Sequence, residues 1–216
     1  DSLTLLALLK AYARFSPHKF DLLAISIDMG FVPDAYEEIN QWCKENNIEY
    51  LIEKTDIAQI LFDIRKEKNP CSLCSKLRRG ALNSIANKNN YNKLALGHHR
   101  DDVMETFLLS MIFEGRLSTF APKSFMSRSK ISLIRPLIYI KESDIRAYAR
   151  DEKLPILTNP CPADKHTQRQ YMKELLTKIN DDIPLSKDRI FSAISHTERY
   201  NLWNDIEAKL TDDKEV

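Results

Sequence analysis

Three cysteines carry the clearest chemical signal in the sequence. Cys71 and Cys74 form a C-x-x-C pair, and the two intervening residues let both sulfurs turn toward one point. Cys161 stands between two prolines, which keep its backbone out of a helix and present its thiol from a loop. Three thiolates from two segments suit a cluster with one open iron, or a zinc ion completed by His166 or a water. A redox dithiol of Cys71 and Cys74, or two buried structural cysteines, are the alternatives.

The fourth cysteine is expected to have a different role, and the cysteines together indicate the cellular compartment of the protein. Cys43 follows Ile39 by four residues on an apolar helical stripe, which indicates a core side chain. Without a signal peptide or a regular small-domain spacing of cysteines, we expect reduced thiols and a cytoplasmic protein. Because the chain opens at Asp1 without a methionine, we also expect sequence upstream of it.

A second group of polar residues lies where a predicted strand ends at Gly97 and a helix follows. Glycine allows close approach of a ligand, and the start of the helix offers free amides to phosphate oxygens. Asp101 and Asp102 could hold Mg²⁺ beside them. Capping of the helix by the same two aspartates explains the sequence equally well. His98 in the turn and Glu105 one turn into the helix complete the group.

Basic side chains gather near the cysteines although the whole chain has a net charge of only +1. Residues 65–79 hold six basic residues and one acid, and a smaller basic group follows Cys161. Such patches favour a phosphate-rich partner such as RNA, while solvated helix faces are the alternative. The two groups are Arg65, Lys66, Lys68, Lys76, Arg78 and Arg79, and Lys165, His166, Arg169 and Lys173.

The sequence shows alternating helix and strand patterns, and the elements that they predict would position these residues. They predict an α/β fold with a doubly wound, mostly parallel sheet over residues 1–158, followed by a small helical appendage over residues 159–216 that contributes the third cysteine. A strand should precede the first helix, so we expect the first strand of the sheet to be absent from this chain. The predicted strands cover 20–28, 48–53, 93–97 and 131–137, and the predicted helices cover 1–15, 35–46, 75–87, 101–114 and 144–152.

Composition excludes several classes of protein. The 216 residues are enough to bury a core without a disulfide or metal. No apolar run approaches the roughly 20 residues that a membrane span requires, so we expect no membrane partner. The four glycines are scattered, which excludes an internal phosphate loop of the G-x-G-x-x-G kind.

Four segments together resemble one family, the tRNA 2-thiocytidine synthetases, which are PP-loop ATP pyrophosphatases. Asp1 and Ser2 are similar to the last two residues of the family's S-G-G-x-D-S nucleotide loop, so the rest of that loop is expected upstream. One departure follows Cys161, where residues 162–164 read Pro-Ala-Asp and the family more often has Gly-Ser-Gln. The matching segments are CSLCSKLRRG, KLALGHHRDDVMETFLLSM, LIRPL and NPCPADKHTQRQ.

The resemblance implies a reaction and its cofactors. Such enzymes use ATP and Mg²⁺ to adenylate the 2-oxo group of a cytidine in the tRNA anticodon loop. Sulfur then replaces the activated oxygen, and AMP leaves. Three cysteines hold a 4Fe–4S cluster in the family, and the matching positions here are Cys71, Cys74 and Cys161. The resemblance further implies tRNA as a partner, a cysteine desulfurase as the sulfur donor, and a homodimer.

The same resemblance implies roles for individual residues. Asp1 and Ser2 would close the pyrophosphate loop, and Gly97 and His98 would line the ATP pocket. The remaining implied positions are Ser26 and Asp28 for adenosine, Asp101 and Asp102 for Mg²⁺ or the target base, and Lys76, Arg78, Arg79 and Arg169 for RNA.

Other functions stay open at this point. Another PP-loop RNA-modifying enzyme is one alternative, for instance a uridine thiolase; a lysidine synthetase fits less well because it needs no three cysteines. A second class is a zinc-bearing or cluster-bearing RNA-binding module without enzymatic activity. A thiol redox protein is a third, disfavoured because a basic helix follows the C-x-x-C pair without a thioredoxin-like Trp-Cys context.

Overall fold

The computed structural model describes the chain except residues 33–34, 68–69, 158–159, 164–166, 201 and 203–216. Its strands form two sheets. In one, β1 and β2 run parallel and pair from Leu23 with Glu49 to Asp28 with Lys54. In the other, β5 lies between a parallel β3 and an antiparallel β4. The strands are β1 (Leu23–Asp28), β2 (Glu49–Lys54), β3 (Lys93–Ala95), β4 (Lys123–Met126) and β5 (Ile131–Ile134).

The α/β class, the parallel pairing and all four predicted strands are confirmed, although the strands are shorter or shifted at their ends. Two features differ from the prediction. The described strands make two sheets rather than one, and β4 was not predicted. Three of the four residues of β4 are exposed, including Phe125, so the strand lacks the buried alternation that identifies a strand in sequence. The strand expected before Asp1 lies outside the chain and stays a prediction.

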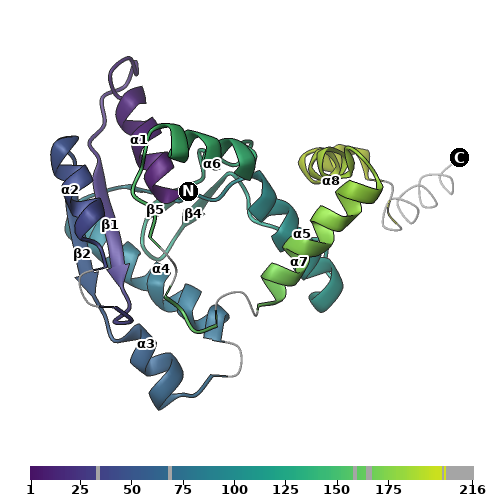
Figure 1. Cartoon of the computed structure of the whole chain (residues 1–216), viewed down its shortest axis with the longest axis horizontal. Helices are drawn as coiled ribbons and strands as arrows, with labels where there is room; N and C mark the ends of the chain where they lie inside the picture. Colours follow the sequence, from purple (N-terminus) through teal and green to yellow (C-terminus); the bar gives the residue numbers. More distant parts are fainter. Residues whose placement is uncertain (33–34, 68–69, 158–159, 164–166, 201, 203–216) are drawn as a thin grey trace, which may run out of the picture.

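Helices surround both sheets (Figure 1). The longest, α4, joins them: its Ile85 packs with Ile27 of β1, and the next residue, Ala86, packs with Leu94 of β3 and Ile131 of β5. Cys43 is fully buried, which confirms its predicted core position. The helices are α1 (Ser2–Tyr12), α2 (Glu37–Glu45), α3 (Ile57–Gln59) with a π-helical turn (Ile60–Ile64), α4 (Pro70–Lys88), α5 (Arg100–Glu114), α6 (Glu142–Asp151), α7 (Gln168–Asp182), α8 (Ser186–Ser195) and a 3-10 turn (Thr197–Arg199).

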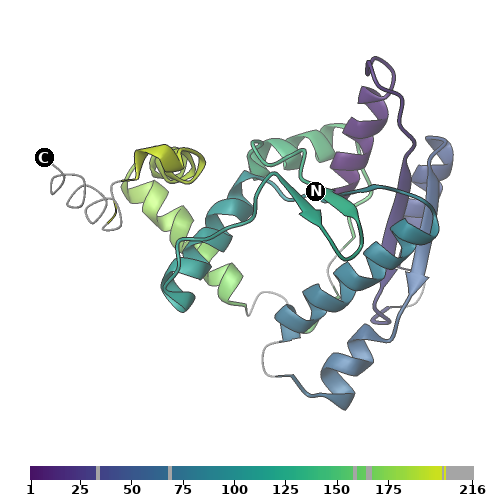
Figure 2. The same ribbon diagram turned by 180° about the vertical axis from the view of Figure 1, so that it is seen from behind.

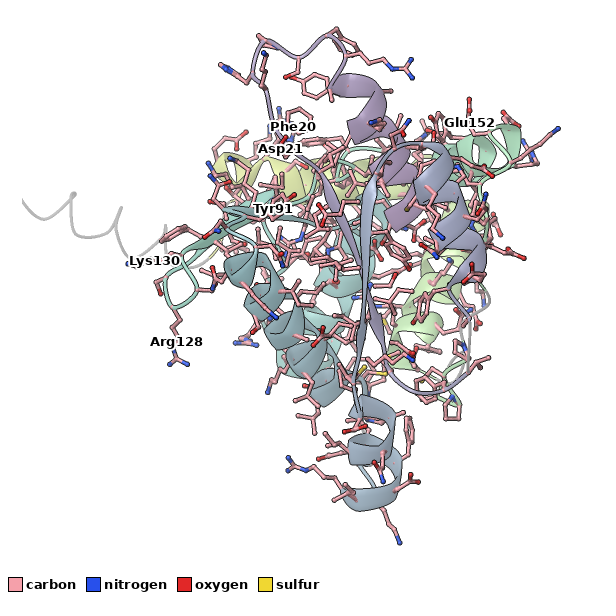
Figure 3. The ribbon with its side chains drawn as sticks, turned by 90° about the vertical axis from the view of Figure 1, so that its left-hand side faces the viewer. Phe20, Asp21, Tyr91, Arg128, Lys130 and Glu152 are labelled. Carbon is pink, nitrogen blue, oxygen red and sulfur yellow. The ribbon has the colours of Figure 1, made fainter. Side chains whose placement is uncertain are left out.

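The last two helices, α7 and α8, lie beside α5 and far from β1 and β2 (Figures 1 and 2). Met104 and Leu108 of α5 form a buried cluster with Met172 and Leu176 of α7. The predicted division of the chain into residues 1–158 and 159–216 stays a prediction, and its boundary falls on residues outside the described part of the chain. Figure 3 views the molecule from the side of β1 and β2, and Arg128 and Lys130, on the turn between β4 and β5, lie at the margin of this view. No described helix has both the length and the apolar composition that crossing a membrane needs.

Candidate active site

The start of α1 meets the end of β3 in a close backbone contact. A Cβ atom on Gly97 would lie 2.9 Å from the carbonyl carbon of Asp1 and 2.9 Å from the amide nitrogen of Ser2. Only glycine fits this approach, because both neighbours are backbone atoms and cannot rotate away. The fold therefore brings together Asp1, Ser2 and Gly97, which the sequence placed in one nucleotide pocket.

The residue after this glycine is a half-buried, neutral histidine. The pKa of His98 is lowered to about 4, mainly by burial and also by the guanidinium of Arg135, while Asp102 opposes the shift. Arg135 Nε donates a hydrogen bond to Nδ1 of His98 at 3.2 Å, and the histidine ring packs against Phe120. Sequence reasoning did not select Arg135, although it lies in the LIRPL segment that carried the resemblance. His98 thus offers an uncharged ring at the strand end.

Asp102 caps its own helix. The amide of His99 donates to Asp102 Oδ2 at 2.9 Å, and the amide of Asp102 donates to Nδ1 of His99 at 3.4 Å, which together form a capping box at the start of α5. His99 Nε2 also lies 3.8 Å from a carboxylate oxygen of Asp1. Asp102 therefore caps the helix, as the alternative explanation expected. His99 was not among the predicted site residues, yet it connects this helix to the start of α1.

Asp101 caps a different helix. Its Oδ2 accepts a hydrogen bond from the amide of Glu142, the first residue of α6, at 2.9 Å. Its Oδ1 lies 3.5 Å from Nζ of Lys187. Among the residues that the structure describes, no three side chains of the metal-ligating types lie close enough to hold a single ion. A role for Asp101 and Asp102 in binding Mg²⁺ or positioning the target base stays a prediction.

Arg169 crosses from α7 to α5. Its Nη1 lies 3.0 Å from Oδ1 of Asp102 and 3.3 Å from Oε2 of Glu105, and its Nη2 donates to Thr106 Oγ1 at 3.1 Å. Lys173, one turn further along α7, pairs with Glu142 at 2.7 Å. Both basic residues of this group that the structure describes therefore bond to carboxylates within the protein, and the predicted contact of Arg169 with RNA stays a prediction.

Glu105 is a buried carboxylic acid beside this arginine. Its pKa is raised to about 7, mainly by burial and also by the carboxylate of Asp102, while the guanidinium of Arg169 opposes the rise. The pKa of the folded state lies above the ordinary value of 4.5, so folding favours the protonated form. Glu105 therefore lowers the free energy of unfolding as the pH rises from about 4.5 to about 7, and the loss is complete above that range.

We expect the variant Glu105→Gln to be more stable than the wild-type protein at pH 8, by about 2–3 kcal/mol, because glutamine resembles the protonated acid. Near pH 4 the two proteins should unfold at the same denaturant concentration. Urea unfolding from pH 4 to pH 8 measures the difference. A variant that is less stable at pH 8 would show that the ion pair with Arg169 outweighs the cost of burial.

The C-x-x-C pair lies inside a helix rather than before one. The prediction began this helix at Ser75, but α4 begins at Pro70, since proline at a first helical position has a suitable φ and needs no hydrogen bond from its nitrogen. Cys71 and Cys74 therefore occupy its first turn. Cys71 is exposed and Cys74 is half-buried. The Sγ of Cys74 donates a hydrogen bond at 3.6 Å to Sδ of Met29, the residue directly after β1.

The three predicted cysteines act on one another electrostatically. Burial raises the pKa of the Cys74 thiol, the guanidinium of Arg78 lowers it, and negative charge on Cys161 and Cys71 raises it. Cys161 is half-buried. Cys71 and Cys161 therefore both lie within electrostatic range of Cys74, although Cys161 is remote in sequence. His166, which was expected to complete a zinc site, lies outside the described residues.

The end of β1 carries the two residues implied for adenosine. Ser26 Oγ accepts a hydrogen bond from the hydroxyl of Tyr50 at 2.8 Å. Asp28 Oδ1 accepts one from the amide of Gly30 at 2.9 Å, which shapes the turn after the strand. The pKa of Tyr36 is raised by burial and by Asp28 and lowered by Arg78, so this tyrosine lies within range of both charges.

The basic segment before and within α4 is only partly free for a partner. Arg65 pairs with Glu67 at 3.1 Å, and Lys68 lies outside the described residues. Lys76, Arg78 and Arg79 are exposed on α4. Arg79 also lies near enough to Arg135 to reinforce the lowering of its pKa, which burial mainly causes. Contact of these three α4 residues with RNA stays a prediction.

Comparisons with known proteins agree with this geometry. A family model of the PP-loop domain matches residues 1–179. The tRNA-cytidine(32) 2-sulfurtransferase of Citrifermentans bemidjiense is 37% identical over 199 residues, which cover 91% of this chain and 78% of that protein. The protein of the same name from Geobacter sulfurreducens is 36% identical over 209 residues, which cover 94% of this chain and 80% of that protein.

A solved structure is similar as well. It is the U34-tRNA thiolase NcsA from Methanococcus maripaludis with its 4Fe–4S cluster. The TM-score is 0.73 at 25% sequence identity, and the match covers 92% of this chain and 68% of the thiolase chain.

The mixed α/β fold is that of a PP-loop domain, the class that the family model matches over most of the chain. Within that class, the chain belongs to the family of tRNA-cytidine(32) 2-sulfurtransferases. The resemblance inferred from the four sequence segments is thereby confirmed.

Proposed function

We propose that this protein thiolates tRNA, using ATP to adenylate the 2-oxo group of a cytidine and replacing the activated oxygen with sulfur. The observation that carries the proposal is the position of Cys74 against Met29, directly after β1 of a PP-loop domain, with Cys71 and Cys161 within electrostatic range of it. Ligands of open α/β folds bind outside the carboxyl ends of the strands. The thiols therefore stand at the edge where a bound nucleotide is expected.

The nucleotide site is built from the strand ends and the start of α1. Asp1 and Ser2 begin this helix, whose first amides suit phosphate oxygens. Gly97 keeps β3 in contact with them, and the neutral ring of His98 adds no charge to the pocket. We assign adenosine to the end of β1, near Ser26 and Asp28. Mg²⁺ accompanies ATP in this proposal, and we assign Asp101 and Asp102 as its ligands.

The donor set suits an iron–sulfur cluster. Three cysteines from two segments match the ligands of a 4Fe–4S cluster with one iron left without a protein ligand. We assign the cluster to Cys71, Cys74 and Cys161. When bound, it supplies an open iron that can hold the sulfur to be transferred.

The chemistry then needs the protein mainly to position its substrates. Attack of the cytidine 2-oxo group on the α-phosphorus of ATP forms the adenylate and releases pyrophosphate. Sulfur adds at C2, and the oxygen leaves with AMP. Lys76, Arg78 and Arg79 present positive charge on α4 next to the cysteines and suit the phosphates of tRNA.

The remaining expectations belong to the same proposal. We place the enzyme in the cytoplasm as a homodimer and assign its sulfur supply to a cysteine desulfurase. Residues 1–158 form the PP-loop domain in this proposal, and residues 159–216 supply Cys161 and the helices that pack on α5.

The direct test is thiolation of an unmodified tRNA transcript. The protein is purified without oxygen and incubated with ATP, Mg²⁺ and a sulfide source, and the digested tRNA is examined by mass spectrometry. We expect 2-thiocytidine in tRNA together with one AMP for each thiolated nucleoside. A protein that binds ATP and tRNA but forms no thionucleoside would refute the proposal.

A uridine thiolase is the second candidate, favoured by the similarity to the U34-tRNA thiolase. The same digest separates the two candidates, because 2-thiouridine and 2-thiocytidine differ in mass. The proposal for cytidine fails if the thionucleoside found is 2-thiouridine alone.

A further inference from the structure

A charged cavity lies between four helices outside the cysteine centre. It encloses about 400 Å³, within the roughly 300–1,000 Å³ that is typical of ligand sites. Residues of α5, α6, α7 and α8 line it, together with Lys141 immediately before α6. Most ligand sites are mainly apolar, whereas eight of the eleven lining residues here carry charge. The cavity therefore suits a charged ligand.

The charges of the lining favour an anion. Five cations face three carboxylates, which leaves a net charge of +2. Each carboxylate already has a cationic partner: Asp101 lies 3.5 Å from Lys187, Glu142 lies 2.7 Å from Lys173, and Asp188 lies 2.7 Å from Arg100. The five cations are Arg100, Lys141, Arg146, Lys173 and Lys187.

The backbone adds to this preference. The first residues of α6 and α8 line the cavity, and each helix has ten residues. Neither helix has a capping hydrogen bond from the side chain of the residue before it. The amide of Glu142 donates to Asp101. In α8 the amide of Ser186 donates to the carbonyl of Ile183 and that of Lys187 to Oδ1 of Asn180, so both helix starts are partly capped from within. Helix N-termini bind phosphate groups through free amides and a favourable dipole.

One buried donor in the lining has no partner. Arg100 is 9% exposed, and its Nη2 donates to Asp188 and to the carbonyl of Lys187. Its Nε is buried without a hydrogen-bond partner among the described residues. A buried donor without a partner costs about 1–3 kcal/mol, so such groups usually mark a ligand or an ordered water.

The cavity is close to the proposed reaction centre. Asp101 lines it and belongs to the motif that follows β3. Glu142 and Arg146, which line it, also lie near Asp1 at the start of α1. An anion in this cavity would thus sit beside the start of α1, on the side of α6.

We propose that this cavity binds a backbone phosphate of the tRNA substrate near the nucleoside that reacts, an inference that rests on the proposed function. The five cations supply most of the attraction, and the starts of α6 and α8 add to it. Phosphate contacts of this kind set the register of a nucleic acid without reading its bases. The cavity would therefore hold the anticodon loop in place while its base reaches the adenylation site.

The test compares two double variants that each remove two positive charges. Lys141→Ala with Arg146→Ala empties the rim of the cavity, whose side chains are 54% and 69% exposed and make only surface ion pairs. Arg150→Ala with Lys178→Ala removes exposed charges from the same region without touching the lining. Binding of an unmodified tRNA transcript is measured by fluorescence anisotropy over a range of salt concentrations, and ATP binding is measured separately.

We expect the cavity variant to bind tRNA about fivefold more weakly and to lower the salt slope by about one to two, as expected for two lost phosphate contacts. The matched variant should show at most half of either change, and both should keep the ATP affinity of the wild-type protein. An unchanged slope overturns the inference, as does an equal loss in both variants. Loss of ATP affinity with unchanged tRNA binding would assign the cavity to free phosphates of the nucleotide instead.

The two proposals can fail separately. Thiolation is scored by mass spectrometry and binding by anisotropy. A cavity-dependent tRNA affinity without any thionucleoside refutes the proposed function alone. Thiolation with a slope that does not depend on the cavity refutes the inference alone.

Discussion

Replacing Cys71, Cys74 or Cys161 by alanine is expected to reduce 2-thiocytidine formation by more than about 100-fold, beyond the 10–100-fold loss typical of groups that only support a metal ligand. Each substitution removes one of the three thiolates assigned to the cluster, and the charge interactions around Cys74 join all three in one site. Thionucleoside analysis of tRNA and the iron content of the anaerobically purified variants measure the two effects. Retained thiolation in any one variant would remove that cysteine from the proposed centre.

Cys43 provides the matched control, because it is a free thiol buried in the core away from the site. We expect Cys43→Ala to cost about 1–2 kcal/mol of stability through lost packing, and to leave thiolation and iron content unchanged. The exposed Cys71, by contrast, should change the stability of the cluster-free protein by less than about 0.5 kcal/mol when replaced. Equal loss of activity in the Cys43 variant would show that general destabilisation explains the effect.

The second large effect is expected from Gly97→Ala. Its new Cβ would lie 2.9 Å from backbone atoms of both Asp1 and Ser2, so β3 and the start of α1 must move apart. Overpacking of this kind costs about 1–3 kcal/mol of stability. Because the displaced atoms border the proposed nucleotide pocket, we also expect ATP affinity to fall about tenfold, which corresponds to about 1.4 kcal/mol. Thermal unfolding and equilibrium dialysis with ATP measure the two losses.

Gly80→Ala is the control for this variant. Gly80 lies inside α4 with no atom within 4 Å of a new Cβ, so alanine should stabilise the helix by about 0.5–1 kcal/mol. ATP affinity should stay unchanged. If Gly97→Ala bound ATP as tightly as Gly80→Ala does, the contact between β3 and α1 would not shape the nucleotide site.

Sequence alone determined the local elements and the residue types at their ends. Apolar runs identified the four main strands, and helical spacing identified the segments between them, because each pattern reports burial within its own element. The C-x-x-C pair and the glycine after β3 could also be recognised from the sequence, because each is defined by neighbouring residues. The family resemblance rested on these short segments, and the comparisons confirmed it. The sequence did not predict strand β4, because its residues are mostly exposed and show no apolar pattern.

Tertiary structure alone decided which side chains of distant segments meet. Asp101 caps α6 at the amide of Glu142, 41 residues away, and Arg169 reaches Asp102 across 67 residues. Periodicity within one element carries no information about partners on another, since packing of the helices chooses them. For the same reason, the position of Cys161 beside the other two cysteines and the cavity between four helices became visible only when the chain was folded.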